Sequence, residues 1–202
     1  MGIIINMHQH IHVFGISIPS YGLLISIGVV IANVIAFIDI QKKQLDINDF
    51  LILEGYCFLG GVIGSKLLYI IISIKEIDWY SIHSFSDFAD LMNGGFVFYG
   101  GLIGGILTLI IGGSIHRLQT NVYISEFIFL LPMIHAFGRV GCFLAGCCYG
   151  IPYEGFGAVV YPENSFAVSG VKLFPIQLGE CFLLFFIVLD LFCIIGGNKK
   201  IA

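Results

Sequence analysis

The sequence predicts an all-α, polytopic membrane protein with about five transmembrane helices. Hydrophobic residues make up 58% of the chain and charged residues only 11%, whereas a soluble domain is about one quarter charged. The apolar residues gather in runs that are long enough to cross a hydrocarbon layer of about 30 Å. Most of the glycines lie inside these runs, which favours close packing of helices within lipid.

We expect a single integral membrane domain over residues 1–202. The expected spans are residues 21–38, 50–74, 95–113, 122–138 and 177–195, with the largest loop, on the outer side, at 139–174. A leader with His8, His10 and His12 precedes the first span. Alternate histidines on a strand could bind a metal, but an exposed leader at the membrane surface is the simpler interpretation.

Two spans carry polar residues that need a partner in hydrocarbon. In the second span, Lys66 either extends toward the membrane surface or pairs with a carboxylate such as Glu54. The fourth span contains Glu126 and His135, and we expect a kink at Pro132.

The distribution of basic residues predicts the orientation. One side of the membrane would hold Lys42, Lys43, Arg117, Lys199 and Lys200, and the other Lys75, Arg139 and Lys172. Because cytoplasmic loops carry an excess of lysine and arginine, we expect the N-terminus outside and the C-terminus in the cytoplasm.

The most unusual stretch is F-G-R-V-G-C-F-L-A-G-C-C-Y-G at residues 137–150. An arginine is costly in hydrocarbon and is kept where it faces a partner or a polar cavity. The planar guanidinium of Arg139 matches a phosphate better than an ammonium would. We therefore expect Arg139 to hold an anionic lipid headgroup near the outer leaflet. The alternative is an ion pair with Glu180 or Glu126 that only holds helices together.

Several titratable groups are expected to share the neighbourhood of Arg139 and to help bind a phospholipid and move a proton. They are Tyr21, Tyr99, His135, Glu180 and Cys142.

The cysteines allow a second interpretation. Cys142, Cys147 and Cys148 with His135 upstream could ligate zinc or an iron–sulfur cluster, but the paired C-x-x-C spacing of a structural zinc site is missing. Cys142 could instead form a disulfide with one of the adjacent pair. The main interpretation therefore includes no metal and no cofactor. The net charge of −4 leaves no basic face for nucleic acid.

Five segments resemble, in order, the motifs of the prolipoprotein diacylglyceryl transferase family. The stretch at 137–150 resembles the family signature G-R-I-G-N-F-x-N-G-E-x-x-G and is the most specific. The others are S-Y-G-L-L at 20–24, G-V-I-G-S-K-L-L-Y at 61–69, G-G-F-V-F-Y-G-G-L-I-G at 94–104 and F-P-I-Q-L-G-E at 174–180. Together the segments extend over most of the chain.

The resemblance implies a transferase of lipoprotein maturation. Such an enzyme transfers a diacylglyceryl group from phosphatidylglycerol to the lipobox cysteine thiol of a prelipoprotein, and glycerol phosphate leaves. It also implies a multi-pass protein of the bacterial cytoplasmic (inner) membrane whose site faces the outer side. The implied partners are phosphatidylglycerol, the lipobox segment and membrane lipids.

Site residues carry over by their match to the motifs. Arg139, Tyr99 and Tyr21 are the implied catalytic residues, with Arg139 on the phosphate. The implied substrate-binding residues are Arg139, Cys142, Gly150, Gln177, Glu180, Gly100 and Gly101.

The sequence departs from the family at several of these positions. Tyr99 replaces the histidine of the H-G-G motif, and Cys142, Ala145 and Cys147 replace two asparagines and a glutamate of the signature. These features indicate a cysteine-containing, C-terminally short branch. The alternatives are a non-catalytic or altered-substrate phospholipid-binding relative and a membrane thiol redox or metal protein.

Overall fold

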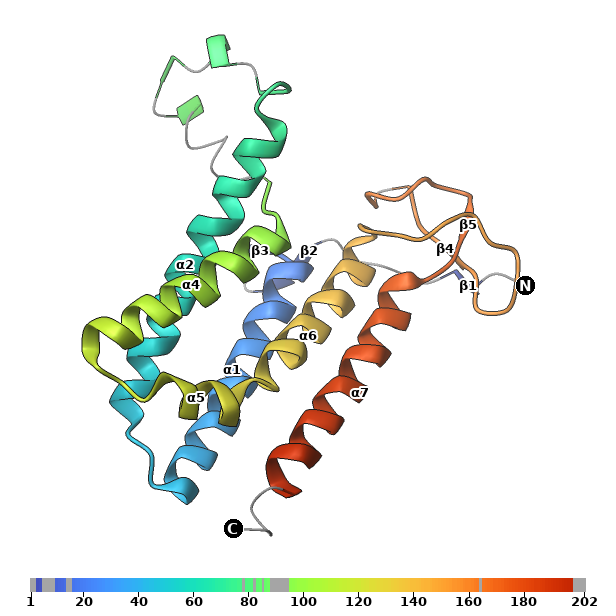
Figure 1. Ribbon diagram of the computed structural model, residues 1–202. Coiled ribbons are helices and arrows are strands. Elements are labelled where there is room, and N and C mark those ends of the chain that lie inside the picture. The colour runs from blue at the N-terminus through green and yellow to red at the C-terminus, as the bar shows by residue number, and fades with distance from the viewer. Residues whose placement is uncertain are drawn as a thin grey trace. The chain divides into compact units, whose positions relative to one another are not determined.

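The computed structural model (Figure 1) describes residues 3–4, 10–13, 16–77, 79–81, 83–84, 86–87, 95–163 and 165–197. The helices are α1 (Ser20–Lys43), α2 (Ile47–Ser73), η1 (Trp79–Ser81), α4 (Phe98–His116), α5 (Thr120–Phe127), α6 (Leu130–Ala145) and α7 (Ile176–Gly197). The short strands are β1 (Ile3–Ile4), β2 (His10–Val13), β3 (Ile16–Pro19), β4 (Val159–Val160) and β5 (Lys172–Leu173). Four residues named above, His8, Gly94, Lys199 and Lys200, lie outside the described residues.

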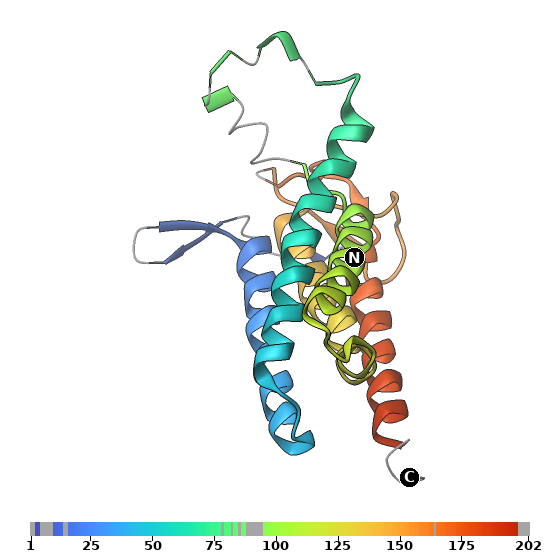
Figure 2. The same cartoon turned by 60° about the vertical axis from the view of Figure 1, so that its left-hand side comes forward.

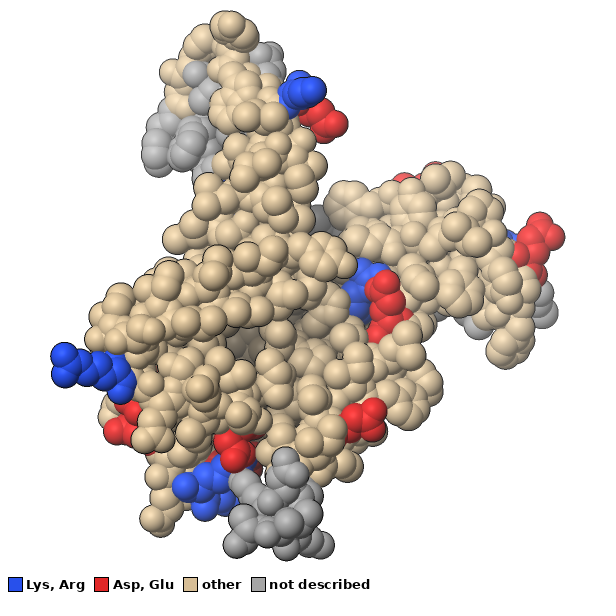
Figure 3. Space-filling view, viewed as in Figure 1, with Lys and Arg blue, Asp and Glu red and all other residues tan. Residues whose placement is uncertain are grey.

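Four of the described helices, α1, α2, α4 and α7, are long and apolar enough to cross a membrane. The pair α5 and α6 makes a fifth crossing if it is one bent span. The face of the molecule in Figure 3 carries few charged side chains among a large majority of uncharged ones. The prediction of an all-α, polytopic membrane protein with about five spans is confirmed.

The fourth span is bent, as its proline predicted. It is broken at residues 128–129, and α5 and α6 meet at an angle of 47°. The kink expected from Pro132 is confirmed, because the break lies four residues before this proline, whose missing N–H cannot donate to the carbonyl of residue 128. Proline is tolerated in the first turn of α6, since the backbone N–H groups of a first turn have no partner within the helix.

Helices α1 and α6 extend furthest beyond the expected spans. Helix α1 continues past residue 38 to Lys43, whose ammonium lies 3.3 Å from Asp39 Oδ2 one turn earlier and also pairs with Glu126. Helix α6 continues to Ala145, so the loop expected to begin at 139 begins at Gly146. Arg139 and Cys142 therefore lie on a helix rather than in a loop.

The chain divides into two compact units, residues 1–43 with 125–202 and residues 44–124. In the first unit, α6 contacts both α1 and α7. A Cβ atom added at Gly141 would lie 2.9 Å from Tyr21 Cα, and one at Gly28 would lie 2.9 Å from Phe137 Cβ. These contacts run in opposite directions along the two helices, so α1 and α6 are antiparallel and close.

The loop from α6 to α7 is folded. Strand β4 pairs with β1 in parallel and with β5 antiparallel. Beneath them lies a small core that joins the end of α6 to the loop and consists of Phe143, Val159, Tyr161, Ala167 and Leu173. Strands β2 and β3 form a separate antiparallel ribbon that leads into α1 (Figure 2).

In the second unit, α2 and α4 pack through glycine faces. A Cβ atom added at Gly64 would lie 2.9 Å from Gly104 Cα and 3.2 Å from the Gly100 carbonyl carbon. The Lys66 ammonium lies 4.7 Å from the centre of the Tyr69 ring and 3.5 Å from the Gly95 carbonyl oxygen. The sequence suggested that Lys66 reaches the membrane surface or pairs with Glu54. In the structure its ammonium contacts the Tyr69 ring and the Gly95 carbonyl oxygen instead.

The glycine contact gives a first prediction. Gly64→Ala should lower the free energy of unfolding by about 1–3 kcal/mol, because its methyl group would meet backbone atoms of α4 that cannot rotate away. Thermal unfolding of the purified protein in detergent measures the effect. The matched control is Gly55→Ala on the same helix, where an added Cβ atom meets nothing within 4 Å. Equal melting temperatures for the two variants would contradict the packing described here.

Candidate functional site

Arg139 is largely buried within the first unit and pairs with a carboxylate of the neighbouring helix. Its side chain is 14% exposed, and Nη2 contacts Oε2 of Glu180 on α7, which is 43% exposed. Of the two ion pairs that the sequence left open, the structure forms Arg139–Glu180, while Glu126 pairs with Lys43. The pair links α6 to α7.

Glu180 does not use all the hydrogen-bonding capacity of Arg139. The Nε atom of Arg139 is buried, and within the described part of the chain it has no hydrogen-bond partner. A buried donor without a partner is costly, and a guanidinium presents its donors in a planar fork that fits phosphate or carboxylate oxygens. One donor of Arg139 therefore remains without an acceptor among the described residues.

Tyr21 and Cys142 lie near this arginine. Tyr21 is in the first turn of α1, with its backbone against Gly141, and its side chain is 45% exposed. Cys142 is buried in the last turns of α6, three residues after Arg139. Because residues three and four apart share a helix face, His135, Arg139 and Cys142 follow one side of α6.

Gln177 connects the start of α7 to the loop after α6. Its side chain is completely buried, and Nε2 donates to the Cys147 carbonyl oxygen at 2.8 Å and to the Tyr161 hydroxyl oxygen at 3.1 Å. Tyr161 is itself buried and packs edge-on against Phe143. Burial raises the pKa of the Tyr161 hydroxyl, so it stays neutral. Gln177 thus fixes the position of Cys147 relative to α7.

Gly150 holds the other end of this loop segment close to α7. Its N–H donates to the Phe174 carbonyl oxygen at 3.2 Å, and an added Cβ atom would lie 2.6 Å from that oxygen. Glycine is therefore required by the close approach of two backbones. Its predicted contact with substrate stays a prediction.

Three of the predicted site residues belong to the second unit. Tyr99 is 69% exposed in the first turn of α4. The next two residues, Gly100 and Gly101, lie against Gly64 and Gly61 of α2. Their contacts within this unit are those of helix packing.

The interpretation of the sequence did not include Tyr161, and it named Cys147 only as a possible metal ligand or disulfide partner. Tyr161 carries no local signal, because its partners Phe143 and Gln177 are distant in sequence. The Cys142 thiol donates a hydrogen bond to the Cys147 sulfur, and this bond, with a smaller contribution from the Arg139 charge, lowers the pKa of Cys147 to about 6.

These features define a polytopic α-helical membrane protein with a buried arginine that pairs with a carboxylate of the neighbouring helix. The family model for prolipoprotein diacylglyceryl transferase matches residues 9–201. The chain therefore belongs to the prolipoprotein diacylglyceryl transferase family.

Curated relatives carry the corresponding name. The chain is 32% identical to phosphatidylglycerol–prolipoprotein diacylglyceryl transferase 2 of Clostridium perfringens, over 93% of this chain and 71% of the relative. It is 34% identical to phosphatidylglycerol–prolipoprotein diacylglyceryl transferase of Clostridium tetani, over 82% of this chain and 64% of the relative. A protein of the same name from Campylobacter jejuni is 28% identical, over 85% of this chain and 64% of the relative.

The thiol contact at Cys147 gives a second prediction. In the reduced, metal-free protein, alkylation of Cys147 by iodoacetamide should rise with pH through about 6, whereas an unperturbed thiol titrates near ~8.5. Cys142→Ala removes the donor and should move the profile to higher pH, while Cys142→Ser keeps a donor and should move it less. Peptide mapping by mass spectrometry identifies the alkylated cysteine. An unchanged profile in Cys142→Ala would show that this bond does not form.

Proposed function

We propose that this protein is a phosphatidylglycerol–prolipoprotein diacylglyceryl transferase. It transfers the diacylglyceryl group from phosphatidylglycerol to the lipobox cysteine thiol of a prelipoprotein, forming a thioether and releasing glycerol phosphate. The reaction would take place in the bacterial cytoplasmic (inner) membrane with the site toward the outer side, and other membrane lipids would surround the protein. The family of the chain and the names of its relatives support this proposal.

The observation that carries the proposal is the state of Arg139. Arg139 has a buried guanidinium with one donor lacking a partner, beside a half-exposed Glu180. Such a group suits the phosphate of the bound lipid, which gains negative charge when it leaves as glycerol phosphate. Preformed donors aimed at developing negative charge are the strongest aid to such a step. In this proposal Arg139 binds the phosphate of phosphatidylglycerol, and Glu180 keeps the guanidinium oriented.

The remaining roles follow from the chemistry of the acceptor. The lipobox thiol must lose its proton before its sulfur attacks the glycerol carbon, and Tyr99, at the position of the family histidine, is the proposed base. Tyr21 would donate a hydrogen bond to the headgroup. Gln177 and Gly150 would hold the loop that contains Cys147, and Cys142 would contribute to the lipid site. Substrate binding by Gly100 and Gly101 stays a prediction from their match to the family motif.

A transfer assay with purified protein tests the proposal. Labelled phosphatidylglycerol and a lipobox peptide should give labelled thioether, and Arg139→Ala should lower the rate by about 100-fold or more, the usual loss when one such donor is removed. The matched control is Lys172→Ala, which removes an exposed positive charge from the same unit and should leave the rate unchanged. Equal rates in wild type and Arg139→Ala would refute the assignment.

The role of Tyr99 is tested by two substitutions at this one position. Tyr99→Phe removes the ionisable group and should abolish transfer. Tyr99→His introduces an imidazole, which is available as a base near neutral pH because its reference pKa is about 6.5. It should therefore keep or raise the rate. If Tyr99→Phe is fully active, Tyr99 is not the base.

A further inference from the structure

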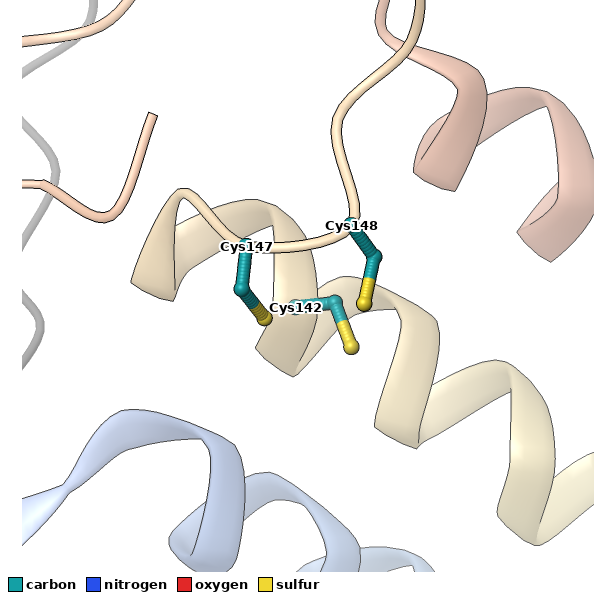
Figure 4. Close-up of side chains that lie close together, drawn as sticks. All are labelled: Cys142, Cys147 and Cys148. Atoms are coloured by element: carbon teal, nitrogen blue, oxygen red, sulfur yellow. The ribbon is translucent and has the colours of Figure 1, made fainter. Parts of the chain in front are cut away.

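Three thiols converge where α6 ends. The sulfur atoms of Cys142, Cys147 and Cys148 all lie within 4.8 Å of one another. Figure 4 shows the Cys142 side chain on the helix and the other two on the segment that follows it. Cys142 is buried, Cys147 is half-buried and Cys148 is exposed, so the cluster reaches from the interior to the surface of the first unit.

The backbone brings these thiols together by two left-handed residues. Gly146 ends α6 with a φ of 71°, and the Cys147 N–H then donates to the Cys142 carbonyl oxygen at 3.1 Å. Cys148 has a φ of 53°, a conformation that residues other than glycine rarely adopt. These two residues reverse the chain direction and turn Cys147 and Cys148 back toward the helix. The turn therefore brings the three thiols together without the C-x-x-C spacing of a structural zinc site.

The turn is held in place by packing and by hydrogen bonds. A Cβ atom added at Gly146 would lie 2.7 Å from Ser165 Cβ and 3.1 Å from Tyr161 Cδ1. The buried Gln177 side chain donates to the Cys147 carbonyl oxygen. Surroundings that fix a strained turn are typical of functional sites rather than of free loops.

The sulfur distances suit a small thiophilic cation. A tetrahedral zinc ion with Zn–S bonds of about 2.3 Å has sulfur atoms about 3.8 Å apart, which small rotations of the three side chains can reach. Thiolates are the ligands that such soft metals prefer. The Arg139 guanidinium, whose charge acts on both Cys142 and Cys147, would offset part of the negative charge of three thiolates.

We propose that Cys142, Cys147 and Cys148 form a zinc site with three thiolate ligands and a fourth position open to an external thiol. Among the described residues, no histidine, aspartate or glutamate joins the three cysteines. Three protein ligands with an open position are the arrangement of zinc sites that act on a bound molecule. On binding, a sulfur–zinc bond forms and the S–H proton passes to a base, which is the buffer for a free thiol and the base of the proposed reaction for an acceptor cysteine.

The open position adds a role for zinc to the proposed function. Only the identity of the external thiol, an acceptor cysteine, rests on that proposed function. An acceptor cysteine bound to zinc would be held as a thiolate, which is the form that must attack the lipid. The existence of the metal site does not depend on the transfer reaction, because the cysteine geometry alone carries it.

Cobalt(II) tests the site because it replaces zinc and absorbs visible light in tetrahedral thiolate surroundings. Reduced, chelator-treated full-length protein should bind one Co²⁺ per chain with sulfur-to-cobalt charge-transfer bands, and Zn²⁺ should displace it. Cys148→Ala changes an exposed residue and should weaken binding at least tenfold. Cys57→Ser and Cys193→Ser change cysteines outside the cluster and should leave binding unchanged. Adding cysteamine should shift the visible bands.

Two results would overturn the metal site. The first is the absence of charge-transfer bands in reduced protein whose thiols are shown to be free. This result overturns the site also when the same protein forms a Cys142–Cys147 disulfide after oxidation. The second is equal binding by wild type and Cys148→Ala. Bands that cysteamine does not shift would refute the open position. Metal binding without lipid transfer would refute the proposed function and support the metal site. Lipid transfer without metal binding would refute the metal site and support the proposed function.

Discussion

The position of one guanidinium in an apolar helix bundle is the constraint on which the first unit depends. Arg139 cannot face hydrocarbon without a partner, and Glu180 on α7 supplies one. The pair requires α6 and α7 to lie side by side, and Gln177, one turn before Glu180, then ties the loop after α6 to the same helix. An ion pair between helices thereby also positions the segment that carries Cys147.

Close contact between helix backbones makes this arrangement possible. Gly141 on α6 lies against the backbone of Tyr21 on α1, so α6 can contact α1 and α7 on different sides. The same principle operates separately in the second unit, where Gly64 and Gly104 allow α2 and α4 to approach. In lipid, small residues stabilise helix pairs through packing, since burial of apolar surface adds little there.

The number and approximate position of the membrane-spanning helices could be predicted, because long hydrophobic runs in the sequence indicate such helices directly. The end of α6 could not, because Gly138, Gly141 and Arg139 resemble a polar loop in the sequence, whereas the helix continues by packing its glycines against α1. The arginine site was predicted by residue type, and only the structure distinguishes Glu180 from Glu126 as the partner. Tyr161 was missed because its contacts come from the fold rather than from any local pattern.

The central claim is that Arg139 binds the phosphate of an anionic lipid, and lipid retention tests it most directly. Wild-type protein and Arg139→Gln would be purified from mixed phosphatidylglycerol and phosphatidylcholine membranes, and the bound lipid measured by native mass spectrometry. We expect wild type to retain phosphatidylglycerol preferentially and the variant, still folded by circular dichroism, to lose that preference. The same preference in both proteins would contradict the claim and would leave Arg139 as a partner of Glu180 alone.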